Sequence, residues 1–311
     1  MTPETTAVAE EAPSSRGALA YLELTKPRVV VMVVATTVVG FYMGLSGPFD
    51  LARLLHTLLS TALAAAGTLA LNEYLERDLD QMMLRTRQRP IPSGRVQPFS
   101  ALLFGSIVAG MGIVYQTLAV DAPTALVTVA TTVSYLFVYT PMKRVSSFCS
   151  LVGAVPGALP PVTGWVAARG TVDLEAWVLF AILFLWQLPH SLAIARLYRD
   201  DYARAGIQVL PVVDPEGSST GRQIVLNSAA LLTVAGMPTL LGLTGGAYFA
   251  SALVLGLGLL AASVQLARRR TLADARRLLF ATLIYLPLLL GVMTIDKTTR
   301  AGFEPRAELL P

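Results

Sequence analysis

Oxygen-bearing side chains recur at helical spacing in the segment 72–80, which reads NEYLERDLD. Asn72, Glu76 and Asp80 follow one another at intervals of four residues, so they spread over only about 80° of a helix surface and project to one side. A second acidic pair, Asp200 and Asp201, follows much later in the chain. Such oxygens suit Mg²⁺, which proteins usually hold through one or two carboxylates together with substrate phosphates.

Basic side chains that suit a phosphate group accompany these acids. They are Lys26, Arg28, Arg85, Arg89, Lys143 and Arg144. Guanidinium and ammonium groups bind phosphate oxygens well. Metal-binding acids and phosphate-binding bases at the mouth of an apolar cavity predict a site for an amphiphile with a diphosphate head, such as an isoprenyl diphosphate. Solvated surface is the alternative reading for the acids, and membrane topology or lipid contact is the alternative for many of the bases.

The elements that must position these residues are membrane helices. The chain of 311 residues is 54% apolar and only 14% charged, with a mean hydropathy of +0.61, whereas soluble domains carry about 25% charged residues. Stretches without Asp, Glu, Lys or Arg cover 29–49, 54–72, 96–120, 122–142, 145–168, 176–195, 223–267 and 278–295. Most can cross a core about 30 Å thick. The stretch 223–267 is long enough for two helices and has a glycine-rich break at 242–246. The sequence thus predicts an all-α membrane protein with nine transmembrane helices.

The distribution of positive charge predicts the orientation of these helices. Nine spans place 19 of the 24 Lys and Arg residues on one side, so that side and the N-terminus are expected in the cytoplasm and the C-terminus in the periplasm. We expect a multi-pass protein of the bacterial inner membrane, in contact with its lipid and without nucleic-acid binding. Residues 1–20 lack a targeting pattern and are expected to form a disordered cytoplasmic tail. Residues 21–297 are expected to form one transmembrane domain, and 298–311 a short periplasmic tail.

The two acidic segments follow the second and the sixth predicted spans. This spacing predicts two four-helix halves with a ninth helix around a central cavity, since internal repeats often place a site between them. A transporter is the alternative from another class, but it would place ionisable groups near the middle of the membrane. An Asp there costs about 2.5–3.5 kcal/mol, and the acids of this chain lie at one edge of the predicted bundle.

Several motifs together resemble a known family. They are LTKPR at 24–28, the run from Asn72 to Pro90, YTPMKR at 139–144, GALPPVTGW at 157–165, WQLPH at 186–190, and Asp201-Tyr202. With these motifs, residues 21 to about 295 resemble the UbiA superfamily of intramembrane aromatic prenyltransferases. The GALPP and WQLPH pieces are more particular to its haem branch, the protoheme IX farnesyltransferases.

The resemblance implies a catalytic group of Asn72, Glu76, Asp80 and Lys143. It implies Mg²⁺ between farnesyl diphosphate and the oxygens of Asn72, Glu76, Asp80 and Asp200 or Asp201, with the other named bases on the diphosphate. Two departures are visible: Glu76 stands where the superfamily usually has Asp, and the second acidic motif is compressed to Asp200-Asp201. Which of these two carboxylates binds metal therefore stays open.

The resemblance also implies the acceptor, a vinyl group of haem b, with haem O as the product for haem-copper oxidases. His190 is the candidate to contact the haem iron, and the alternative is a buried histidine bonded to a neighbouring helix. The rival acceptors are 4-hydroxybenzoate or a quinone precursor. A haem A synthase or oxidase assembly factor is an implied partner. Aromatic residues could line the apolar chamber, namely Tyr135, Tyr139, Trp165, Phe184 and Trp186.

Overall fold

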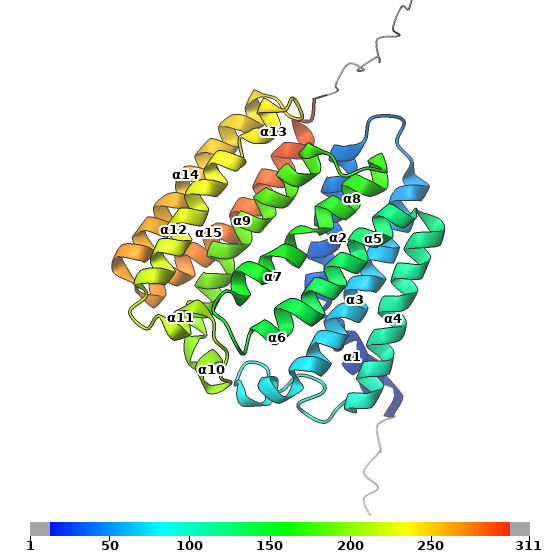
Figure 1. Cartoon of the computed structure of the whole chain (residues 1–311), viewed down its shortest axis with the longest axis vertical. Coiled ribbons are helices and arrows are strands. Elements are labelled where there is room, and N and C mark those ends of the chain that lie inside the picture. The colour runs from blue at the N-terminus through cyan, green and yellow to red at the C-terminus, as the bar shows by residue number, and fades with distance from the viewer. Residues whose placement is uncertain (1–12, 299–311) are drawn as a thin grey trace, which may run out of the picture.

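The computed structural model describes residues 13–298, which form a bundle of helices (Figure 1). The first elements are α1 (Pro13–Leu24), α2 (Pro27–Gly44), α3 (Leu51–Met82), α4 (Pro98–Ala119), α5 (Ala122–Val133), the π-helical η1 (Ser134–Tyr139) and α6 (Thr140–Met142). They are followed by α7 (Cys149–Ala158), α8 (Pro160–Arg169), α9 (Leu174–Leu197), α10 (Arg199–Arg204) and α11 (Leu210–Val213). The last are α12 (Ser218–Val234), α13 (Met237–Leu240), α14 (Gly246–Arg269) and α15 (Leu272–Ile295).

Nine segments within residues 13–298 are long and apolar enough to cross a membrane, as the sequence predicts. Three of the spans join more than one element: α5 with η1 and α6, α7 with α8, and α12 with α13. The stretch 223–267 does divide into two spans, and Gly242 in the break has a φ of 72°, which favours glycine. The division confirms the predicted number of spans.

Capping residues explain where several helices begin. The Asp50 side chain accepts a hydrogen bond from the Arg53 amide at the start of α3, and Asp121 does the same for Thr124 at the start of α5. Proline occupies the first position of α2, α4 and α8, where its missing N–H costs nothing.

The predicted terminal tails lie largely outside the described residues. Residues 1–12 and 299–311 are not described, but the structure forms α1 from Pro13 onward. The end of the predicted N-terminal tail is therefore helical. Leu24 in α1 is fully buried and packs in one cluster with Ala70 of α3, which explains why this segment is ordered.

The helices form two groups that meet at α7, α8 and α9. In Figure 1, α3, α4 and α5 lie on one side, and α12, α14 and α15 lie on the other. Helix α2 packs closely against α8, and α9 contacts α7, α12 and α15. The predicted internal repeat of two four-helix halves stays a prediction.

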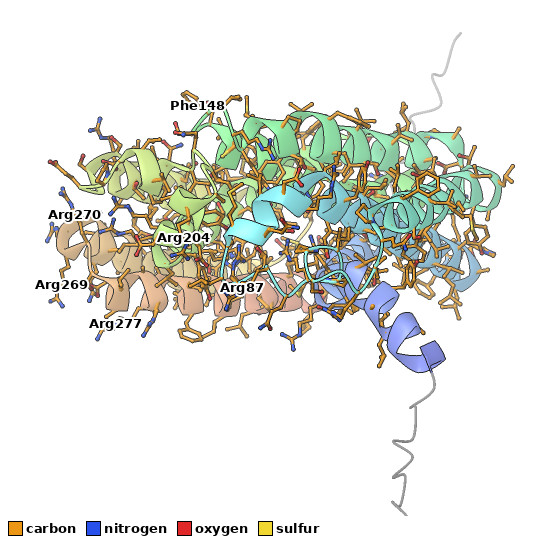
Figure 2. The ribbon with its side chains drawn as sticks, turned by 90° about the horizontal axis from the view of Figure 1, so that it is seen from below. Arg87, Phe148, Arg204, Arg269, Arg270 and Arg277 are labelled. Atoms are coloured by element: carbon orange, nitrogen blue, oxygen red, sulfur yellow. The ribbon has the colours of Figure 1, made fainter. Side chains whose placement is uncertain are left out.

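Both acidic segments lie at one edge of the molecule. The elements α1, α6 and α10 occupy the same end of the bundle in Figure 1, while α13 lies at the opposite end. Figure 2 views the molecule from this edge, and Arg87, Arg204, Arg269, Arg270 and Arg277 are spread over it. The positive charge that the sequence assigns to one side is therefore found at the edge where the acids lie.

Candidate active site

Three side chains on the last turns of α3 form the centre of the site. Asn72, Glu76 and Asp80 are all buried, and their common spacing directs them to the same side of the helix. Their burial within protein avoids the high free-energy cost of exposing polar and ionisable side chains to lipid. The structure thus confirms the helical stripe that the sequence predicts.

Each of these three residues is paired with a basic side chain from another segment. The pairs are Lys26 Nζ with Asn72 Oδ1 at 3.0 Å, Arg89 Nη1 with Asp80 Oδ2 at 2.7 Å, and Lys143 Nζ with Glu76 Oε1. The Asn72 amide also donates to the Thr140 hydroxyl at 3.1 Å. Three basic side chains therefore form a row that faces three oxygen atoms of α3, which accept their hydrogen bonds. Such a row of positive charges suits an anionic ligand.

The charges in this row influence one another. Burial, together with the neighbouring Arg89 guanidinium, lowers the pKa of Lys26 to about 8. Burial also opposes the charge of Lys143, but the Glu76 carboxylate holds its pKa well above the ordinary value. The pKa of Arg89 is likewise raised, because Asp80 outweighs the effect of burial.

The other predicted phosphate-binding residues lie outside the row. Arg28 and Arg144 are exposed, and neither forms an ion pair within the described part of the chain. Arg85 lies over the rings of Tyr198 and Tyr202 and donates to the Tyr202 hydroxyl at 3.2 Å. Arg85 therefore links the segment after α3 to the second acidic segment.

Of the second acidic pair, only Asp201 is buried. Its carboxylate accepts from the Leu84 amide at 3.4 Å and pairs with Arg204, whereas Asp200 is exposed. Ala205 and Ile207 pack in one cluster with Leu79 and Met83, which flank Asp80. The structure therefore brings the two acidic segments together and directs Asp201 toward the end of α3.

Three of the predicted metal ligands, Glu76, Asp80 and Asp201, form ion pairs with basic side chains. Among residues 13–298, no group of three or more His, Cys, Asp and Glu side chains is gathered closely enough to hold a metal. Asp80 Oδ1, however, is buried and has no hydrogen-bond partner among the described residues. This unpartnered oxygen and the donor types beside it fit a hard cation such as Mg²⁺.

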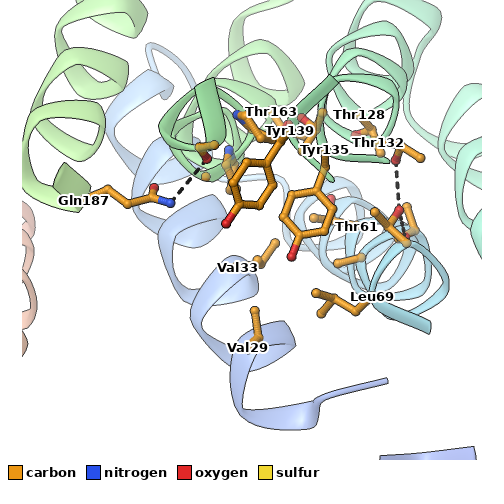
Figure 3. Close-up of a pocket in the computed structure, with 18 residues that line it drawn as sticks. Val29, Val33, Thr61, Leu69, Thr128, Thr132, Tyr135, Tyr139, Thr163 and Gln187 are labelled. Carbon is orange, nitrogen blue, oxygen red and sulfur yellow. Dashed lines mark hydrogen bonds between the residues drawn. The ribbon is translucent and has the colours of Figure 1, made fainter. Parts of the chain in front are cut away.

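A cavity of about 270 Å³ lies beside the row of charges, among α2, α3, α5, η1, α7, α8 and α9 (Figure 3). Val29 and Val33 of α2 line one wall, and Leu69 of α3 lies opposite. Gly157 and Pro160, at the break between α7 and α8, line another part. The lining is mainly apolar, with threonine hydroxyls among it, so the cavity suits a hydrocarbon chain.

Tyr139 connects the cavity with the charged row. Its ring lines the cavity and lies 4.4 Å from Lys143 Nζ, which is a cation–π contact. The π-helical turn η1 presents Tyr135 and Tyr139 on one side, and their ring centres lie 5.4 Å apart (Figure 3). The prediction that these two tyrosines line the chamber is confirmed.

Three other predicted lining aromatics do not line this cavity. Trp165 is buried and donates its indole N–H to Asp173 at 3.3 Å, and Phe184 packs against the core. Trp186 donates to the Thr282 carbonyl at 2.9 Å. Helix packing therefore accounts for these rings.

His190 is held between α9 and α15. Its Nδ1 lies 2.9 Å from the Thr282 hydroxyl, and its ring stacks on Trp186 with centres 4.9 Å apart. The Thr282 hydroxyl donates its one proton to the Leu279 carbonyl at 2.6 Å, so it must accept from His190 Nδ1–H. This leaves the lone pair of the neutral imidazole on Nε2, the nitrogen that is then able to bind iron.

Sequence reasoning missed two residues of the site. Glu73 is buried beside the stripe and accepts from the Ile91 amide at 3.5 Å, and Thr140 accepts from Asn72. The sequence could have indicated Glu73, because a carboxylate at the end of an apolar stretch usually needs a hydrogen-bond or charged partner. Thr140 carried none, because its contact with Asn72 depends on the packing of α6 against α3.

The site combines a row of paired polar and charged side chains with an apolar cavity inside a bundle of membrane helices. This combination is typical of intramembrane enzymes that bind amphiphilic anions. Residues 33–285 match the model of the UbiA prenyltransferase family. The chain therefore belongs to the UbiA prenyltransferase family.

Known proteins of similar sequence cover most of this chain. A protoheme IX farnesyltransferase of Solibacter usitatus is 48% identical over 89% of this chain and 98% of its own length. One of Koribacter versatilis is 43% identical over 89% of this chain and 93% of its own length.

Solved structures show the same fold at low identity. A structure of digeranylgeranylglyceryl phosphate synthase has a TM-score of 0.76 at 16% identity and covers 90% of this chain and 98% of its own. A UbiA homologue of Archaeoglobus fulgidus bound to GPP and Mg²⁺ has a TM-score of 0.61 at 16% identity and covers 88% and 99%.

Proposed function

We propose that this chain transfers the farnesyl group of farnesyl diphosphate to a vinyl group of haem b and so makes haem O. The observation that carries this proposal is the 48% identity to a protoheme IX farnesyltransferase over 98% of that protein's length. The geometry agrees, because a diphosphate head and a hydrocarbon tail match the charged row and the cavity beside it.

The head of the donor substrate belongs at the charged row. Lys26, Arg89 and Lys143 would bind the diphosphate oxygens, and the oxygens of Asn72, Glu76 and Asp80 would hold Mg²⁺. Asp201 completes the set from the other side, in preference to the exposed Asp200. The metal, when bound, neutralises charge on the diphosphate. The Archaeoglobus fulgidus homologue, which was solved with GPP and Mg²⁺, supports a prenyl diphosphate and Mg²⁺ as the ligands.

The reaction then needs charge stabilisation and a dry chamber. The bond between C1 of the farnesyl group and the diphosphate oxygen breaks, and its electron pair leaves on oxygen. Lys26, Arg89 and Lys143 stabilise that developing charge. The apolar cavity keeps water from the allylic cation. The π electrons of the haem vinyl group form the new C–C bond, and water adds to the resulting cation and loses a proton, which gives a hydroxyethylfarnesyl group.

The acceptor is positioned through His190. Its Nε2 carries the lone pair that would bind the haem iron, because Nδ1 donates to Thr282. Stacking on Trp186 fixes the plane of the imidazole. A second bond that orients the ring is common for histidines that bind metals.

The enzyme belongs in the cytoplasmic membrane of a bacterium, with its N-terminus in the cytoplasm and its C-terminus in the periplasm. The location of most Lys and Arg residues on one side supports this orientation. The product would pass to a haem A synthase or to an oxidase under assembly.

The test is an incubation of the purified full chain with haem b, farnesyl diphosphate and Mg²⁺, followed by mass analysis of the haem. We expect haem O, and no product when EDTA replaces Mg²⁺. Parallel incubations contain 4-hydroxybenzoate in place of haem b. A prenylated phenol without any haem O would overturn the proposed acceptor.

A further inference from the structure

The end of the cavity farthest from the charged row is polar. Thr61 of α3 and Thr128 of α5 both line the cavity and are both buried. Gln116 of α4 is completely buried and donates its amide N–H to the Thr61 hydroxyl at 3.3 Å. These three residues come from three different spans and are called the polar floor below.

Two oxygens of the polar floor have no hydrogen-bond partner among the described residues. They are Gln116 Oε1 and Thr128 Oγ1. Other threonines of the same cavity are satisfied, since Thr131 donates to the Val127 carbonyl at 2.8 Å and Thr132 pairs with Thr68 at 3.0 Å. A buried oxygen without a partner is costly in an apolar interior. The floor therefore favours a polar neighbour, such as a buried water molecule, over a hydrocarbon.

The position of the floor sets the depth of the cavity. Thr61 lies about three helical turns from Asn72 along α3, which is about 16 Å at 1.5 Å per residue. Between them, Ala64, Ala65 and Thr68 line the wall. This depth is close to the extended length of a tail of three isoprene units, measured from a diphosphate at Asn72.

We propose that Thr61, Gln116 and Thr128 form a polar floor that limits the prenyl tail to three isoprene units. The proposal rests on the proposed function, in which a prenyl diphosphate is the donor. A tail of four units would press apolar carbons against Thr61 and the unpartnered Thr128 oxygen, the two floor residues that line the cavity, and expel any water that solvates them. A tail of two units would leave part of the apolar wall uncovered.

The experiment measures the binding of unreactive thiolodiphosphate analogues with tails of 10, 15 and 20 carbons by calorimetry, in the presence of Mg²⁺. The variants are Thr128→Val, which has almost the same shape, and Gln116→Leu. The matched control is Thr131→Val, because that hydroxyl also lines the cavity but is already satisfied by its own helix.

We expect the unchanged protein to bind the 15-carbon analogue most tightly. Thr128→Val should raise the affinity for the 20-carbon analogue relative to the 15-carbon one by about tenfold, the size expected when an unpaired buried oxygen is removed. Gln116→Leu, which removes the hydrogen-bond partner of Thr61, should change this ratio in the same direction. Thr131→Val should leave this ratio within about twofold. An unchanged ratio in Thr128→Val, with tight binding of the 15-carbon analogue retained, overturns the polar floor.

The binding measurement is independent of the acceptor. If analogues bind with the expected preference but no haem O forms with farnesyl diphosphate, the proposed acceptor fails and the polar floor stands. If haem O forms but the variants do not change the preference for tail length, the polar floor fails and the proposed function stands.

Discussion

At the scale of single residues, the site depends on three basic side chains that donate hydrogen bonds to the oxygens of Asn72, Glu76 and Asp80. Lys26 precedes α2, Arg89 follows α3 and Lys143 follows α6, yet all three reach the same face of α3. Asp80 differs from Asn72 and Glu76 because one of its carboxylate oxygens, Oδ1, is fully buried and has no hydrogen-bond partner among the described residues, while Oδ2 accepts from Arg89. It is therefore the residue at which loss of charge should affect the reaction most.

Asp80→Asn should lower kcat for haem O formation by about 100-fold or more, the range seen when one group that stabilises the transition state is removed. The amide can neither balance Arg89 nor offer a charged oxygen to Mg²⁺. The control is Asp78→Asn, on the same helix with a side chain that is 65% exposed, which should keep nearly full activity. Undiminished turnover by both Glu76→Gln and Asp80→Asn would remove this stripe from the mechanism.

His190→Ala should weaken binding of ferric haem b and remove the spectral signature of an imidazole ligand. The physical reason is that His190 Nε2 carries a lone pair, as its bond to Thr282 requires. Optical titration of the purified protein with haem b measures both effects. His56→Ala is the control, because His56 pairs with Tyr115 at 2.6 Å in another part of the bundle. Identical spectra for His190→Ala and the unchanged protein would rule out iron ligation by His190.

At the scale of elements, glycines allow the helices that carry the cavity walls to approach closely. A Cβ atom on Gly40 of α2 would lie 1.9 Å from the Pro161 carbonyl oxygen of α8, and one on Gly164 would lie 2.0 Å from the Thr37 carbonyl oxygen. Both contacts are with backbone, which cannot move aside without a shift of a whole helix. The spacing of α2 and α8 therefore sets the width of the cavity beside Val33 and Thr163.

Gly40→Ala should destabilise the protein by about 1–3 kcal/mol, as overpacking of a close interface does. Thermal unfolding in detergent measures the change, and activity should fall with it as α2 moves from α8. Gly110→Ala is the matched control, since a Cβ there meets nothing within 4 Å and the residue lies on the exposed side of α4. Equal melting temperatures for the two variants would show that α2 and α8 can separate at no cost.

At the scale of the whole molecule, the site lies at the edge of the bundle that carries most of the arginines. At this edge, Figure 2 shows Arg87, Arg204, Arg269, Arg270 and Arg277. From the positive-inside rule we expect this edge to lie in the cytoplasm. With this orientation, we expect the diphosphate head to reach the charged row from the cytoplasmic side while the hydrocarbon tail enters the cavity.

Labelling of single cysteines tests this orientation. In a Cys149→Ala background, Ser93→Cys follows α3 and Ser46→Cys lies between α2 and α3, and both positions are exposed. A membrane-impermeant maleimide should label Ser93→Cys only in inverted vesicles and Ser46→Cys only in right-side-out vesicles. The opposite labelling pattern would show that the topology is inverted and that the site lies at the periplasmic face.

The helices and the acidic stripe were predictable because they depend on short-range patterns. Apolar runs of sufficient length gave the nine spans, and the spacing of Asn72, Glu76 and Asp80 alone placed them on one face. The second acidic pair was predictable as a motif, but the choice between Asp200 and Asp201 was not. Burial made that distinction, and burial depends on how α10 packs beside the end of α3.

By itself, the sequence determined the class of fold, the number of spans, the direction of the stripe and the resemblance to one family. The tertiary structure decided which base meets which acid, that Arg28 and Arg144 stay outside the row, and which residues line the cavity. The physical reason is the sequence separation of the residues that interact. The period of a helix is fixed by residues that are neighbours in the sequence. The contact of Lys143 with Glu76, or of Gln116 with Thr61, exists only after separate helices have packed.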